Sequence, residues 1–163
     1  RPPLRGGRPR GRGGGLHGAP LPAALSNRAA ARLRTGDFQE SVKDCNEGLV
    51  CLLEGLGAPG LSSEGLGEWV GQRLLPRAAE GAPVDDPWGP GRPQRVSLQR
   101  LLARRGAAFS HMRLYGDAAA DLTTAAEVCR SGGDDSQAAS LRQDADRVRQ
   151  LAQEARPREE SAE

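Results

Sequence analysis

The feature that most constrains the fold of this chain is an internal repeat between its two halves. A shift of 77 residues lays Phe38 on Tyr115, and each of these aromatic residues stands beside a glycine-containing turn. A helix pair cannot bury its own apolar face, so repeated pairs must stack to form a core. The repeat therefore predicts stacked helical hairpins. The same shift superposes these pairs: Arg28 on Arg105, Ala30 on Ala107, Ala31 on Ala108, Asp44 on Asp121 and Gly48 on Ala125.

Apolar residues recur at steps of three and four in three regions, and this spacing is typical of amphipathic helices. The first region, 21–53, is predicted to be one helical hairpin, and the second, 96–131, is predicted to be another. The third region, 134–156, is predicted to be a single helix that caps the stack. The apolar line of this last helix runs through Leu141, Ala145, Val148, Ala152 and Ala155.

Glycine and acidic residues predict the turns within the two hairpins. Gly36 is expected to end the first helix, and Asp37 with Glu40 three residues later forms a capping-box pattern that begins the second. In the second hairpin, a turn is expected at residues 115–117, Tyr-Gly-Asp. The helix that follows is expected to end at residues 132–133, Gly-Gly.

Three segments lack a helical pattern over most of their length. Residues 1–20 contain mainly Arg, Gly and Pro, and are predicted to be disordered, as is the tail at 157–163. Residues 54–95 are rich in Gly and Pro and are too long for an ordinary connection, so we expect a long disordered insertion. A short helix near 68–75 is compatible with its sequence, and both tryptophans are expected to be half exposed there: Trp69 and Trp88.

Two arginine–aspartate pairs share the same spacing of 16 residues. Arg28 and Asp44 lie in the first predicted hairpin, and Arg105 and Asp121 lie at the equivalent positions of the second. This spacing links the first helix of a hairpin to the second. We interpret the pairs as structural ion pairs, which contribute about 0–1 kcal/mol when they are exposed.

The composition argues against an enzyme and against a membrane protein. No P-loop, zinc motif or nucleophile elbow occurs, and neither His17 nor His111 has a cysteine or carboxylate at ligand spacing. We therefore expect no catalysis, no cofactor and no metal. No apolar run approaches the roughly 20 residues that span a membrane. The three cysteines have no CxxC spacing and indicate reduced thiols in a cytoplasmic chain: Cys45, Cys51 and Cys129.

Three stretches resemble the tetratricopeptide domains of chaperone adaptors, and most of all dynein axonemal assembly factors of the dyslexia-susceptibility-candidate type. They are 26–33, which begins Ser-Asn-Arg-Ala-Ala, 104–115, which begins Arg-Arg-Gly-Ala-Ala-Phe, and the end helix at 144–149, Asp-Ala-Asp-Arg-Val-Arg. Tetratricopeptide repeats have a usual period of about 34 residues, and the insertion accounts for the longer spacing here. The family's upstream repeat and its β-sandwich domain have no counterpart in this sequence.

The resemblance implies a groove that binds the acidic C-terminal tail of the heat-shock chaperones Hsp90 and Hsp70. The positions that match the tail-binding residues of such adaptors are Asn27, Arg100 and Arg104, and Arg100 replaces the usual lysine. Arg100 and Arg104 are four residues apart, so they share one helix face. Guanidinium groups bind carboxylates by paired hydrogen bonds. The implied role is that of a cytoplasmic co-chaperone, with dynein subunits or other assembly factors as further partners.

Two other functions are compatible with the first residues of the chain. Arg-Gly-Gly occurs at 5–7 and 12–14, and such segments bind RNA through phosphate contacts and stacking. Aromatic residues do not alternate with these arginines, so we rank nucleic acid below a protein partner. The Arg-rich, acid-free start also has the charge of an organelle transit segment, but it lacks serine and an amphipathic stripe.

Overall fold

The computed structural model describes residues 21–76, 86–89 and 91–157, and these residues form an all-helical structure. The prediction of an all-α chain is therefore confirmed for this part of the chain. The elements are α1 (Pro22–Thr35), α2 (Phe38–Leu53), α3 (Ser63–Trp69), the π-helical turn η1 (Val70–Leu74), α5 (Pro93–His111), α6 (Tyr115–Ser131) and α7 (Asp135–Glu154).

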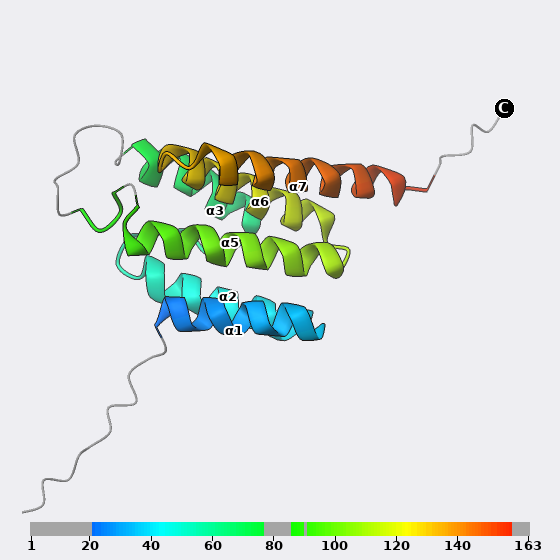
Figure 1. Cartoon of the computed structure of the whole chain (residues 1–163), viewed down its shortest axis with the longest axis horizontal. Coiled ribbons are helices and arrows are strands. Elements are labelled where there is room, and N and C mark those ends of the chain that lie inside the picture. Colours follow the sequence, from blue (N-terminus) through cyan, green and yellow to red (C-terminus); the bar gives the residue numbers. More distant parts are fainter. Residues whose placement is uncertain (1–20, 77–85, 90, 158–163) are drawn as a thin grey trace, which may run out of the picture.

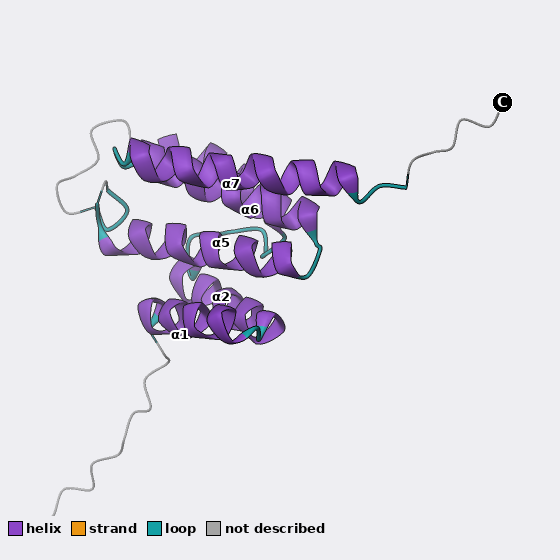
Figure 2. Cartoon of the chain, turned by 45° about the vertical axis from the view of Figure 1, so that its right-hand side comes forward, coloured by secondary structure: helices purple, strands orange, loops and turns teal. Residues whose placement is uncertain are grey.

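The long helices are arranged in two layers. Helices α1, α5 and α7 lie in one layer and run in the same direction, and α2 and α6 return behind them (Figures 1 and 2). Contacts join each helix to the next long helix along the chain, from α1 through α2, α5 and α6 to α7. Helix α3 packs on α6. The predicted hairpins at 21–53 and 96–131 and the last helix are thus all present as helices.

The 77-residue shift also relates the turns of the two hairpins. Gly36 ends α1 with φ 83°, and Arg113, its equivalent, follows α5 with φ 61°. Helix α6 begins at Tyr115, so the prediction of a turn at residues 115–117 is wrong, and the turn lies at 112–114. The turn comes earlier because the amides of Met112, Arg113 and Leu114 bond back to carbonyls of α5.

Replacing Arg113 with glycine is expected to stabilise the protein by about 0.5–1 kcal/mol. A left-handed backbone costs an ordinary residue about 1–2 kcal/mol, and glycine avoids this cost. Glycine also loses more conformational entropy on folding, which offsets part of the gain in stability. Urea denaturation followed by circular dichroism measures the change. The reciprocal variant, Gly36→Arg, should lower stability at the equivalent turn. An unchanged midpoint in both variants would contradict this account.

The start of α2 does not use the predicted capping box. Asp37 occupies the N-cap position, but its side chain caps no backbone amide of α2. Its carboxylate instead accepts a hydrogen bond from Oγ1 of Thr35 at 3.3 Å, on the preceding turn. The Glu40 carboxylate interacts with Lys43 and with Arg32 rather than with the N-cap amide. Both carboxylates are therefore engaged by neighbouring side chains.

The prediction of a long disordered insertion at 54–95 is wrong for much of this segment. Helix α3 and η1 form one continuous helical stretch that begins before the short helix expected near 68–75. Leu66, Val70 and Leu74 are buried in the common core, and Trp88 is only 6% exposed, whereas Trp69 is half buried as expected. Apolar residues spaced at helical intervals supply this burial despite the surrounding glycines. Residues 77–85 and 90 lie outside the described residues.

The core contains the apolar faces of all the long helices and of the insertion. Its cysteines are free thiols, as predicted, and burial raises the pKa of Cys45 to about 12 and that of Cys129 to about 11. The predicted disordered segment 1–20, with the Arg-Gly-Gly motifs, lies outside the described residues, as does the predicted disordered tail 157–163 except for its first residue. The fully buried core side chains include Leu25, Ala29, Leu49, Leu98, Leu101, Leu102, Ala125 and Ala145.

Candidate functional site

The two predicted arginine–aspartate pairs form, and they join the helices of each hairpin. Arg28 donates from Nε and Nη2 to the two oxygens of Asp44 at 2.9 and 2.7 Å. Arg105 donates in the same way to Asp121 at 2.6 and 2.8 Å. The prediction of both links is confirmed. The assumption that they are exposed is wrong for the second pair, whose two side chains are each 1% exposed.

Arg105 connects more of the structure than its equivalent does. Its Nη1 donates to the amide oxygen of Asn46 on α2 at 3.0 Å and to the carbonyl of Leu61 in the insertion at 2.8 Å. Burial raises the pKa of Asp121, and the hydrogen bonds from Arg105 and Ser63 act in the opposite direction. Arg105, on α5, thus links the second hairpin to α2 of the first hairpin and to the insertion.

The predicted binding residues Asn27, Arg100 and Arg104 lie on α1 and α5, which contact each other directly. Arg104 spans this contact and donates from Nη1 to the hydroxyl of Ser26, which is buried. A guanidinium has five N–H donors, so this bond leaves others available. Asn27 and Arg100 are exposed to solvent. The structure therefore brings two helices that carry these residues together, with Arg104 partly engaged between them.

A third arginine that the sequence analysis missed lies near this pair. Arg34 follows Asn27 by seven residues, so both occupy one face of α1. Burial lowers the pKa of Arg104, and the positive charges of Arg100 and Arg34 lower it further. The heptad spacing from Asn27 to Arg34 was the available signal. No described carboxylate forms an ion pair with any of the three arginines.

The same face of α5 continues toward α7. His111, seven residues after Arg104, lines a hollow of about 170 Å³ between α5 and α7 with Asp144 and Arg147. The His111 ring also stacks on Phe38, with ring centroids 4.4 Å apart. We call the surface formed by Asn27, Arg34, Arg100, Arg104, His111 and Arg147 the α1/α5/α7 face. Four of these six residues are arginines, and the Asp144 carboxylate lines the adjoining hollow.

The part of the chain that the structure describes offers no arrangement of His, Cys, Asp and Glu side chains suited to a metal ion. Within the same residues, none of the helices combines the length and apolar character required to cross a membrane. Comparison of the chain with family models, with curated proteins and with solved structures finds no match in any of the three.

Proposed function

We propose that this chain is a tetratricopeptide-type protein-binding module, and that its α1/α5/α7 face binds the acidic C-terminal tail of a partner protein. The observation that carries the proposal is the cluster of Arg34, Arg100 and Arg104. The charges of Arg100 and Arg34 add to the effect of burial in lowering the pKa of Arg104, and no described acidic side chain forms an ion pair with any of the three. An acidic ligand would supply the missing negative charge.

The chemistry of the face suits a terminal carboxylate with a neighbouring acidic side chain. Arg100 and Arg104 are one helical turn apart, so two guanidinium groups can each bind one carboxylate in a bidentate way. The Asn27 amide adds a neutral donor on the neighbouring helix. Capture of a C-terminal carboxylate is a recurring mode of peptide recognition. Binding, rather than catalysis, is the role that this arrangement supports.

The partner class follows from the resemblance of the sequence to chaperone adaptors. Heat-shock chaperones carry acidic tails, and a cytoplasmic adaptor would hold such a tail while its client, here of the dynein-subunit class, is assembled. Parallel helices that present one concave layer are the usual binding surface of helical-repeat proteins. The shared direction of α1, α5 and α7 supports this proposal (Figure 1).

Titration calorimetry with an acetylated peptide ending in Glu-Glu-Val-Asp tests the proposal. We expect micromolar binding, equivalent to about −8 kcal/mol. Arg100→Ala and Arg104→Ala should each weaken it at least tenfold, or by about 1.4 kcal/mol, because each removes a charged hydrogen-bond donor. The peptide amidated at its C-terminus should bind more weakly than the free acid.

The matched control is Arg130→Ala. Arg130 is exposed near the end of α6, away from the α1/α5/α7 face, and has no ion pair among the described residues. This variant should bind as the unmodified chain does if the face, rather than net charge, determines affinity. Circular dichroism must show normal helicity in all variants. Absence of binding by a helical, unmodified chain would refute the proposed function.

A further inference from the structure

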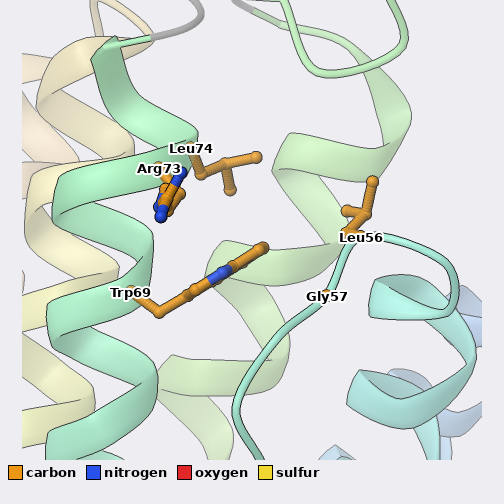
Figure 3. A pocket seen from close by; sticks show the side chains of 5 residues that line it. All are labelled: Leu56, Gly57, Trp69, Arg73 and Leu74. Atoms are coloured by element: carbon orange, nitrogen blue, oxygen red, sulfur yellow. The ribbon is translucent and has the colours of Figure 1, made fainter.

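A separate hollow lies between the segment after α2 and the inserted helix. Its volume is about 410 Å³. It is lined by five residues: Leu56, Gly57, Trp69, Arg73 and Leu74. In Figure 3, Leu56 and Gly57 come from one side, and the three other residues come from α3 and η1 on the opposite side. Ligand pockets typically measure about 300–1,000 Å³. No lining residue belongs to the α1/α5/α7 face, so the two sites are distinct.

The π-helical turn explains why three residues of one helix line the same hollow. In an α-helix each residue turns by roughly 100°, so a residue five positions on points away from the first. In η1 the amide of Leu75 bonds to the carbonyl of Val70, five residues earlier, and the helix is locally wider. Trp69, Arg73 and Leu74 therefore face one space. Such turns occur frequently at functional sites.

The hollow combines apolar side chains from Leu56, Trp69 and Leu74 with a larger share of polar surface, and its one charged lining residue is Arg73. Leu74 is buried, whereas Trp69 and Leu56 are half buried. Arg73 is exposed, projects from the same helical stretch as Trp69 (Figure 3), and has no ion pair among the described residues. The carboxylate of Glu68, one turn earlier, accepts a hydrogen bond from Gln72. The charge of Arg73 therefore has no counterpart within the hollow.

A hollow of this size leaves the packing of its walls incomplete. Apolar atoms that face open space lose the dispersion contacts that a neighbouring atom would give. An aromatic ring fits beside the flat indole of Trp69, because aromatic pairs stack or meet edge to face. Arg73 follows Trp69 by four residues, about one turn of this helical segment, and a guanidinium binds a carboxylate through paired bonds. The ring and the carboxylate must therefore be close together in the ligand.

We propose that this hollow binds the C-terminal aromatic residue of a partner peptide, with the ring against Trp69 and the terminal α-carboxylate on Arg73. A terminal phenylalanine carries its ring and its carboxylate on the same residue, which matches the spacing of one helical turn. The open side of the hollow leaves room for the rest of the peptide. The pocket would thus give the protein a second, chemically different peptide site.

Nuclear magnetic resonance of the complete ¹⁵N-labelled chain tests this proposal, with N-acetylphenylalanine and its uncharged amide as probes. The sequence has two tryptophans, and the variant Trp69→Phe identifies the indole signal of Trp69. We expect the acid to shift this signal saturably with a dissociation constant of about 1 mM, and the amide to bind at least tenfold more weakly. Trp88 is buried and should not respond. The tripeptide Gly-Gly-Phe with a free terminus should bind at least as tightly as the acid.

The variants separate this site from the α1/α5/α7 face. Arg73→Gln should weaken binding of the acid tenfold and leave the amide unchanged, whereas Arg100→Ala should leave both unchanged. The exposed position of Arg73 means that its replacement should not unfold the chain. Equal binding of acid and amide, no saturable shift by about 20 mM acid, or failure of the tripeptide to bind would each overturn the proposal. None of these outcomes depends on binding of the acidic peptide to the other site.

Discussion

Replacing Arg105 with methionine is expected to destabilise the protein by about 3–5 kcal/mol, because it leaves the buried carboxylate of Asp121 without its partner. The side chain is 1% exposed and also bonds to Asn46 and to the carbonyl of Leu61. Domains of this size are usually stable by only about 5–15 kcal/mol. The variant should therefore be near the limit of folding at room temperature.

The first hairpin provides the matched control, Arg28→Met. Arg28 is 52% exposed, and Asp44 also pairs with Arg32 at 2.9 Å, so its carboxylate keeps a cation. Urea denaturation followed by circular dichroism should show a small shift for Arg28→Met and a large one for Arg105→Met. Similar shifts in the two variants would show that burial and the extra bonds of Arg105 have no effect.

The double variant Arg105→Met with Asp121→Leu distinguishes two contributions to the free energy of unfolding: the net stabilisation by the ion pair, and the penalty for leaving one buried charge unpaired. Removing both charges avoids the desolvation that raises the pKa of Asp121. The double variant should therefore recover much of the stability that the single variant loses. Stability of the double variant below that of Arg105→Met would contradict this explanation.

Replacing Gly106 with alanine is expected to destabilise the protein by about 1–3 kcal/mol, because the added methyl group would overpack the contact between α5 and α6. A Cβ atom there would lie 2.9 Å from Cγ of Leu122, 3.1 Å from the carbonyl oxygen of Ala118 and 3.3 Å from Cβ of Asp121. The oxygen of Ala118 is a backbone atom, and the Cβ of Asp121 is bonded directly to the backbone, so neither can move without the helix. Helix α6 must therefore move as a whole to make room.

Gly116→Ala is the control for the helix-forming preference of alanine. Gly116 lies in the first turn of α6, and a Cβ atom there would meet no atom within 4 Å. This variant should gain about 0.5–1 kcal/mol, because alanine loses less freedom than glycine on folding. Thermal denaturation of the two variants should thus give shifts of opposite sign. A gain in stability for Gly106→Ala would show that the helices separate easily.

The repeat made the helices and their order predictable, but not the local differences between the hairpins. The shift places Ala29 at the position equivalent to Gly106, which suggests that a methyl group is tolerated at both. Only the structure shows that α6 lies too close to Gly106 to leave room for a methyl group there. In the same way, the spacing predicted both ion pairs, but the sequence contained no indication that one would be buried by the insertion.

The glycines and prolines of the insertion predict disorder, whereas its widely spaced apolar residues are sufficient to fold part of it onto the core. Leu66, Val70 and Leu74 recur at intervals of four, and they bury as one face. Of the candidate site, Asn27, Arg100 and Arg104 came from resemblance, whereas the proximity of Arg34 depends on how α1 lies against α5. The hollow beside Trp69 depends on a π-helical turn, for which the sequence shows no recognisable pattern.

The three-way attachment of Arg105 has a consequence for how the chain unfolds. Stacked repeats usually behave as a row of units that interact only with their neighbours, so end units can open separately. Here one side chain joins α2, α6 and the inserted segment. Amide hydrogen exchange should then show similar protection in the middle of α2, α5 and α6, as expected for a single cooperative unit. The helices at the two ends, α1 and α7, would exchange first.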